Sequence, residues 1–425
     1  MPRKTVVSVI GIVLIAGAAS LTMYLLRMGP FAESFEDEQQ APPAASPTGP
    51  DGGDGDSDEA PPKPPSEPEE PPPPQPLGWG PNEDHFSAAQ QAVAAMSDEE
   101  LAGQVMISHW SGTSPEAAAK TVRDHHLAGL ILMGPNIEGA DQITAVSDGV
   151  QNQQQDAGRD WPAIISVDQE GGRVSRLESV IDPVPAFGKL ASEGTSEVRD
   201  VMQRMGEQMM DLGFTMDFAP VADISIGPQN PTIGDRAAGS EPEIVAKSVE
   251  AALDGLLAGG VIPTVKHFPG HGSVTTDSHV EVPIQDRDLD DLRENDFVPF
   301  QAAVSAGVPV VMMGHVALEV LDPQVPASLS APAYELLRDE LGFDGVIVTD
   351  AMNMQAITKS TGVGQEALRA LEAGADLVLM PTDIAAAHDA VVGALASGDL
   401  DRDRIEEAAT RVVALQMWFG EALED

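Results

Sequence analysis

The pair Asp277 and His279 has the residue types and the spacing for proton transfer. The two side chains are two positions apart in a stretch rich in Gly, Ser and Thr. A carboxylate beside an imidazole holds one tautomer of the ring and raises its basicity, which suits a general acid/base. An ordinary polar loop is the alternative interpretation of an isolated Asp-x-His. The preceding stretch 266–272, Lys-His-Phe-Pro-Gly-His-Gly, favours the catalytic interpretation because it adds two histidines and a lysine.

Asp350 directly follows the apolar run 345–349. A carboxylate at the end of a buried strand would lie at the rim of a low-dielectric core, where it could act as a nucleophile or an electrostatic stabiliser. The alternative is a structural role as the N-cap of the next helix, since Asp is a preferred cap residue. The position alone leaves both interpretations open.

Four basic residues are candidates for binding a ligand. Lys266 and His267 end another apolar run, where they would face a pocket. Arg176 and Arg236 carry planar, forked donors that could bind a polyhydroxylated ligand. In a very acidic chain each arginine could instead form an ordinary salt bridge.

A metal site is not predicted, although three histidines (267, 271 and 279) lie close together in the sequence. The helix-borne motif His-Glu-x-x-His is absent, and the proline and glycines between these histidines disfavour a helix. No cofactor is predicted either. The phosphate-binding patterns Gly-x-Gly-x-x-Gly and Walker A are both absent, which disfavours an open doubly wound sheet.

The elements that must position these residues are short apolar runs that alternate with amphipathic helical stretches. Strands buried on both faces lack polar alternation and are typical of parallel sheets. Eight such runs predict a (β/α)8 barrel, with an open doubly wound sheet as the second choice. In such a barrel, active residues follow the strands at the C-terminal face. The eight runs are 104–108, 128–133, 163–167, 215–219, 262–267, 308–313, 345–349 and 376–380.

The composition excludes several functional classes. The formal net charge is -45, so the chain is not expected to bind nucleic acid, whose phosphates it would repel. Without cysteine there is no disulfide, thiolate metal site or cysteine nucleophile. Residues 33–77 contribute only -11 of the charge and residues from 78 onward contribute -37, so the acidity belongs mainly to the predicted globular part.

Three segments are predicted along the chain. Residues 1–32 begin with a basic end and contain 22 uncharged residues, 5–26, which is long enough to span a bilayer. We expect an anchor with the remainder of the chain outside the cytoplasm; a cleaved signal segment and secretion are the alternative. Residues 33–83, rich in proline and acids, read as a disordered linker. Residues 84–425 form the predicted single catalytic domain.

Five motifs resemble those of glycoside hydrolase family 3, in its β-N-acetylhexosaminidase branch. The resemblance covers about residues 86 to 420, in the order of the family. The most specific motif is the stretch 266–279 that contains the histidines. Together with it, the resemblance rests on Val-Asp-Gln-Glu-Gly-Gly-Arg-Val at 167–174, Phe-Ala-Pro-Val-Ala-Asp at 218–223, Ile-Gly-Asp-Arg at 233–236 and Gly-Phe-Asp-Gly-Val-Ile-Val-Thr-Asp at 342–350.

The resemblance implies a retaining double displacement on a (β/α)8 barrel. Asp350 would be the nucleophile, and His279, supported by Asp277, would replace the usual carboxylic acid as the acid/base. Sugar hydroxyls and the acetamido group would be bound by Asp168, Arg176, Arg236, Lys266 and His267. The chain departs from some relatives at Ala351, where they carry a second acid, and at Ala237, where they carry Ser.

The expected function is therefore the release of terminal β-N-acetylglucosamine (GlcNAc) from muropeptides or chitooligosaccharides. With 4% aromatic residues, a long sugar platform is not expected, which favours an exo-acting enzyme. A β-glucosidase-like or phosphorolytic enzyme of the same fold and a non-catalytic, anchored sugar-binding protein are the alternatives. We expect a monomer whose partners are a small carbohydrate and, through residues 1–32, the membrane.

Overall fold

The structure, a computed structural model, describes residues 74–424. The predicted membrane segment 1–32 and the predicted linker up to residue 73 lie outside the described residues. Packed structure begins within the range predicted as linker: Trp79 is 4% exposed, and Pro76 forms a β-bridge with Asn82. Among residues 74–424, no helix is long and apolar enough to cross a membrane.

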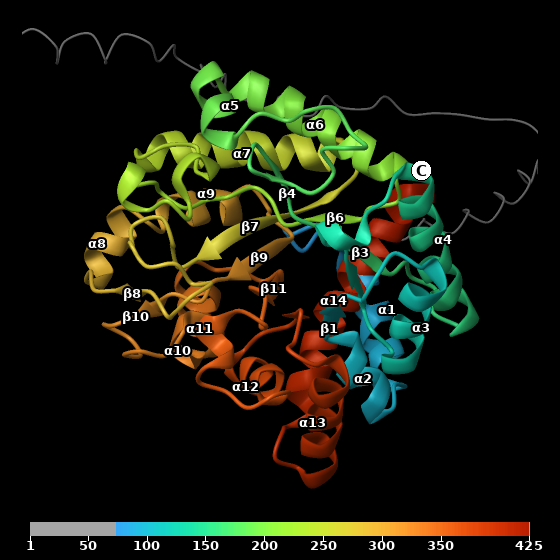
Figure 1. Cartoon of the computed structure of the whole chain (residues 1–425). Coiled ribbons are helices and arrows are strands. Elements are labelled where there is room, and N and C mark those ends of the chain that lie inside the picture. Colours follow the sequence, from blue (N-terminus) through green and yellow to red (C-terminus); the bar gives the residue numbers. More distant parts are fainter. Residues whose placement is uncertain (1–73, 425) are drawn as a thin grey trace, which may run out of the picture. The chain divides into compact units, whose positions relative to one another are not determined.

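Eight parallel strands form a nearly closed, barrel-like sheet (Figure 1). Their order is β11-β9-β7-β6-β3-β2-β1-β12, and a bridge between Val348 and Leu377 connects the first strand to the last. The backbone N–H of Thr349 donates to the carbonyl of Leu377 at 2.9 Å across the same seam. The strands are β1 (Met106–Ser108), β2 (Gly129–Ile131), β3 (Ile164–Val167), β6 (Met216–Asp217), β7 (Ile262–Phe268), β9 (Val310–Met313), β11 (Val346–Thr349) and β12 (Val378–Leu379).

Seven of the eight predicted apolar runs contain one of these strands in full, and the eighth run, 262–267, covers all of β7 except its last residue, Phe268. Every residue of the eight strands is buried, as expected for a parallel sheet with helices on its outside. The α/β class and the parallel, barrel-like sheet predicted from the sequence are thereby confirmed. Two small sheets lie beside the barrel: β4 (Gln169–Gly171) pairs antiparallel with β5 (Val174–Ser175), and β8 (Ile284–Gln285) pairs parallel with β10 (Ala317–Leu318).

Helices surround the sheet (Figure 1). Several begin at residues whose side chains satisfy free backbone N–H groups, such as Ser97 before α2, Ser114 before α3 and Asp383 before α13. The α-helices are α1 (Glu83–Ala94), α2 (Asp98–Gln104), α3 (Pro115–His125), α4 (Ala140–Asp156), α5 (Phe187–Glu193), α6 (Thr195–Asp211), α7 (Pro242–Ala258), α8 (Leu289–Glu294), α9 (Val298–Ser305), α10 (Ala331–Glu335), α11 (Gln355–Thr358), α12 (Gln365–Ala373), α13 (Ile384–Ser397) and α14 (Arg402–Glu424).

Single turns of other helix types occur in the loops at η1 (Gly134–Asn136), η2 (Gly227–Gln229), η3 (Gly234–Arg236), η4 (Ala327–Leu329) and the π-helical η5 (Leu336–Glu340). Because all eight strands are parallel, their C-terminal ends lie at one face of the barrel. The loops after β3, β7, β9 and β11 therefore converge there, and these loops carry the polar motifs singled out in the sequence.

Candidate active site

One cavity at the C-terminal ends of the strands brings together seven of the eight residues predicted for the site. Its volume is about 280 Å³, which suits a ligand the size of one sugar ring. The eighth residue, Asp277, is in contact with the cavity residue His279. The seven are Asp168, Arg176, Arg236, Lys266, His267, His279 and Asp350.

Strand β7 supplies two consecutive residues to the cavity, Lys266 and His267. In a regular strand, successive side chains point to opposite faces. The pairing of β7 with β9 shifts register between Val265 and Phe268, at the position of these two residues. This irregularity allows both side chains to reach the cavity, as β-bulges do near other active sites.

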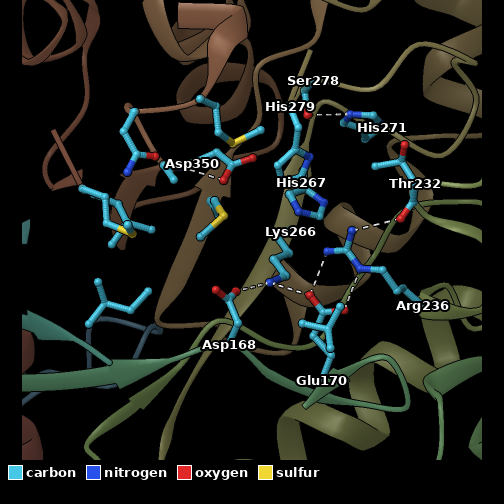
Figure 2. A pocket seen from close by; sticks show the side chains of 18 of the residues that line it. Asp168, Glu170, Thr232, Arg236, Lys266, His267, His271, Ser278, His279 and Asp350 are labelled. Atoms are coloured by element: carbon cyan, nitrogen blue, oxygen red, sulfur yellow. Dashed lines mark hydrogen bonds and ion pairs between the residues drawn. The ribbon is translucent and has the colours of Figure 1, made fainter. Parts of the chain in front are cut away.

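Four charged groups form an ion cluster at one side of the cavity (Figure 2). Lys266 Nζ lies 2.8 Å from Asp168 Oδ1 and 2.7 Å from Glu170 Oε1. Arg236 donates to both oxygens of Glu170, from Nε at 2.7 Å and from Nη2 at 2.8 Å, and its Nη1 donates to the carbonyl of Thr232 at 3.2 Å. Two positive and two negative charges therefore balance within the cluster.

Burial and neighbouring charges shift the pKa values of this cluster in opposite directions. Burial alone would raise the pKa of Glu170, but Lys266 and Arg236 hold that pKa far below its usual range. Burial alone would likewise lower the pKa of Lys266, and the carboxylates of Asp168 and Glu170 raise it above its usual value. Both groups therefore keep their charges at neutral pH, although each is 2–3% exposed.

Asp350 follows β11 directly and lines the cavity. Its N–H donates to the carbonyl of Met313 at 2.8 Å, and its Oδ1 accepts from the N–H of Ala351 at 2.7 Å. Burial would raise the pKa of Asp350, but the nearby imidazoles of His315 and His267 and the Ala351 N–H lower it to about 2. The carboxylate is therefore ionised at neutral pH, as a nucleophile must be.

The structure rejects the N-cap interpretation of Asp350. The next helix, α11, begins at Gln355, and its N-cap position is Met354. The side chain of Asp350 instead turns into the cavity (Figure 2).

His315 holds the backbone beside Asp350. Its Nε2 lies 3.0 Å from the carbonyl oxygen of Ala351, so this nitrogen must carry a proton and donate it. The other ring nitrogen, Nδ1, lies 2.7 Å from Ser328 Oγ. Burial lowers the pKa of His315, which is fully buried, although the nearby carboxylate of Asp350 acts in the opposite direction.

Asp223 organises two of the histidines. Its Oδ2 lies 2.6 Å from His267 Nδ1, and its Oδ1 accepts from the backbone N–H of His271 at 2.6 Å. Burial would raise the pKa of Asp223, but the neighbouring His267 and His271 hold it below its usual value. The ionised carboxylate fixes the proton of His267 on Nδ1 and leaves Nε2 for the cavity.

The predicted proton-transfer pair has the expected contact. His279 Nδ1 lies 2.8 Å from Asp277 Oδ1, which also accepts from the His279 N–H at 2.9 Å. Both side chains are exposed, His279 by 64% and Asp277 by 43%. The carboxylate keeps a proton on Nδ1, so Nε2 is the nitrogen that can exchange a proton with a ligand.

Two glycines shape the loop between Asp168 and Arg176. Gly171 and Gly172 have φ angles of 90° and 55°, which favour glycine. A Cβ atom at Gly171 would lie 2.4 Å from the carbonyl oxygen of Pro185, so no larger residue fits without a shift. The tight turn joins β4 to β5 and brings both Glu170 and Arg176 to the cavity.

Arg176 differs from the other cations of the site. Its Nε is buried and has no hydrogen-bond partner within residues 74–424, and the side chain lines the cavity. Because the side chain lines the cavity, its guanidinium can offer donors to a ligand, whereas Arg236 directs two N–H groups at Glu170 and one at the carbonyl of Thr232.

A comparison with known protein families identifies the family of this chain. The model of the glycosyl hydrolase family 3 N-terminal domain matches residues 94–415. The chain belongs to glycosyl hydrolase family 3.

Similar proteins in this family include β-hexosaminidases. The family-3 chain is 38% identical over 312 residues to "Beta-hexosaminidase LpqI" of Mycobacterium tuberculosis, covering 70% of this chain and 78% of that protein. It is 36% identical over 280 residues to "Beta-hexosaminidase" of Stenotrophomonas maltophilia, covering 64% of this chain and 81% of that one. The solved family-3 β-N-acetylglucosaminidase of Paenibacillus sp. str. FPU-7 has a TM-score of 0.74 and 35% identity, over 78% of this chain and 64% of that chain.

These findings confirm the family and the enzyme class predicted from the sequence. The protein is a glycoside hydrolase, and its relatives in family 3 carry the name of an activity on N-acetylhexosaminides. Sequence reasoning did not single out Glu170, Asp223, His271 or Ser278 as site residues, although all four lie within the motifs that it quoted.

Asp217 is a buried carboxyl group of this family-3 hydrolase, and its burial should lower the stability of the fold at neutral pH. Its Oδ1 accepts from the N–H of Gln169 at 2.9 Å, and its Oδ2 has no partner within the described part of the chain. Burial raises the pKa of Asp217 well above its ordinary value, more than the Gln169 N–H and Lys266 lower it. The folded protein therefore keeps a proton that the unfolded chain releases near pH 4.

Replacing Asp217 by Asn should stabilise the protein relative to the parent, and this gain in stability should increase as the pH rises. A folded-state pKa above the unfolded value costs about 1.4 kcal/mol per pH unit between the two pKa values, and the amide does not titrate. We expect the melting temperature of the Asn variant, relative to that of the parent, to increase from pH 4.5 to pH 7.5. A difference that is the same at both pH values would show that Asp217 is ionised in the folded state.

Proposed function

We propose that the protein is an exo-acting, retaining β-N-acetylglucosaminidase. The observation that carries this proposal is the convergence of an ionised Asp350 and the Asp277–His279 pair on one cavity that also holds a charge-balanced cluster for binding. The names of the similar proteins, β-hexosaminidase and β-N-acetylglucosaminidase, support N-acetylglucosamine as the sugar that is released.

In the first step, a carboxylate oxygen of Asp350 attacks the anomeric carbon of the terminal sugar. The bond to the glycosidic oxygen breaks, and that oxygen takes the proton from Nε2 of His279. The products are a glycosyl ester on Asp350 and a free aglycone, with His279 neutral. Asp277 stabilises the protonated ring before transfer through its contact with Nδ1.

In the second step, water replaces the aglycone. Neutral His279 takes a proton from the water at Nε2 while the water oxygen attacks the anomeric carbon from the face opposite Asp350. The ester bond breaks, Asp350 regains its negative charge and the sugar leaves with its original β configuration. A histidine performs both transfers near neutral pH, where a carboxylic acid would need a raised pKa.

The remaining polar residues would bind the sugar. The carboxylate of Asp168 accepts from hydroxyl groups, Arg176 and Lys266 offer donors, and Nε2 of His267 can accept from a hydroxyl group. Because the ion cluster has no net charge, it suits a neutral sugar. Among the described residues that line the cavity, none is Phe, Tyr or Trp, which supports a single-sugar pocket over an extended platform.

A panel of aryl glycosides tests the proposal. The rates on p-nitrophenyl β-GlcNAc and β-glucoside should differ by at least about 100-fold in favour of GlcNAc, which corresponds to about 2.7 kcal/mol. Proton NMR of the first product should show the β anomer. Faster cleavage of the glucoside, or an α product, would overturn the proposed substrate or the proposed mechanism.

The same panel in phosphate buffer separates hydrolysis from phosphorolysis. We expect free GlcNAc in both buffers; a sugar phosphate would identify the phosphorolytic alternative. Among natural substrates, we propose muropeptides and chitooligosaccharides. The N-terminal anchor, the extracytoplasmic location and the monomeric state stay predictions from the sequence.

A further inference from the structure

His271 is a buried histidine of the site that takes no part in either proton transfer. It is 2% exposed, and burial lowers its pKa. Its backbone N–H is held by Asp223, the carboxylate that also holds His267. The rings of His267 and His271 pack edge to face, with centroids 6.1 Å apart. Burial and the contact with His267 therefore restrict the ring of His271, although its Nδ1 has no hydrogen-bond partner within residues 74–424.

Ser278 joins this buried ring to the acid/base pair. It lies between Asp277 and His279 in the chain, and it is 2% exposed while both neighbours are exposed. Its Oγ lies 3.0 Å from Nε2 of His271 (Figure 2). A side chain held inward at this position fixes the backbone from which the two flanking side chains extend.

The other contacts of this loop act at its ends or on its backbone. Near its start, Ser273 Oγ donates to Asp296 Oδ1 at 2.6 Å. Beyond the pair, the exposed Lys359 donates from Nζ to the carbonyl of Val280 at 2.5 Å. The bond of Ser278 to His271 is the buried side-chain contact next to the two functional side chains.

We propose that His271 and Ser278 are positioning residues for the acid/base: through their hydrogen bond they hold the backbone that carries Asp277 and His279, and so set the direction in which Nε2 of His279 faces the glycosidic oxygen. The proposal rests on the proposed role of His279. A transition state that needs proton transfer is sensitive to small displacements of the acid. A transition state in which the aglycone leaves without a proton is not sensitive to the position of the acid.

The test compares two GlcNAc substrates with different leaving groups. In Ser278→Ala, we expect kcat/KM on chitobiose to fall about 10- to 100-fold, a part of the 10²–10⁴-fold that general acid catalysis contributes. On the activated 2,4-dinitrophenyl glycoside, kcat/KM should fall less than about 3-fold. His271→Leu should have the same effect, and His271→Gln should restore most of the rate, because its amide can again bond to Ser278.

Ser225→Ala is the matched control. Ser225 Oγ accepts from the N–H of Gly227 at 3.0 Å outside the cavity, so both rates should stay unchanged. Equal losses on both substrates in Ser278→Ala, or no loss on chitobiose, would overturn the positioning role. His279→Ala is measured in parallel: if it also lacks leaving-group dependence, the proposed acid/base itself is wrong.

Discussion

Asp350→Asn should lower kcat on p-nitrophenyl β-GlcNAc by about 10⁴-fold or more, the scale on which loss of a nucleophile acts. An amide has nearly the same shape as a carboxylate and can still accept from the N–H of Ala351, which is 2.7 Å from Oδ1. It cannot form the glycosyl ester. The substitution therefore removes the chemistry and keeps the local structure.

Binding separates this effect from damage to the pocket. Calorimetry with the product GlcNAc should give a Kd for Asp350→Asn within a few-fold of the parent value. The matched control is Asp344→Asn, which changes an exposed aspartate just before the other end of β11 and should retain full activity. Activity of Asp350→Asn above about 1% of the parent would exclude Asp350 as the nucleophile.

The barrel could be predicted because its strands are buried on both faces and therefore read as apolar runs. The ends of the runs were less predictable. The run 104–108 starts inside α2, where Gln104 is buried and donates to Gln416 at 2.6 Å. The run 376–380 starts at Asp376, whose Oδ2 accepts from the N–H of Ile347 at 2.9 Å. Tertiary hydrogen bonds decide such boundaries, and periodicity does not reveal them.

The site residues that could be predicted have characteristic residue types at the ends of strands. The site residues that were not predicted are recognised by their ion-pair partners, which are distant in the sequence. Glu170 binds Arg236, which is 66 residues away in the chain, and Asp223 binds His267, which is 44 residues away. No spacing in the sequence encodes these partners. Asp223 does follow the apolar stretch 218–222, so the signal that pointed to Asp350, a carboxylate directly after an apolar run, also applies to it.

His279→Ala should make the two proposed steps separately observable. Without the acid, kcat/KM on chitobiose should fall about 10²–10⁴-fold, while the dinitrophenyl glycoside still reacts with Asp350 because its leaving group needs no proton. Without the base, water attacks the ester slowly. A burst of dinitrophenolate should therefore precede slow turnover, and mass spectrometry of the quenched protein should find one GlcNAc residue on the peptide that contains Asp350.

The pH dependence of that burst tests the nucleophile and the acid/base together. Since the pKa of Asp350 is about 2, the carboxylate stays ionised as the pH falls from 7 to 4, and it loses its charge only near pH 2. The burst rate in His279→Ala should then change little over this range. The matched control is His125→Ala, a partly buried histidine at the end of α3 outside the cavity, which should behave like the parent protein. Equal losses on both substrates in His279→Ala, without a covalent adduct, would assign the proton transfer to another group.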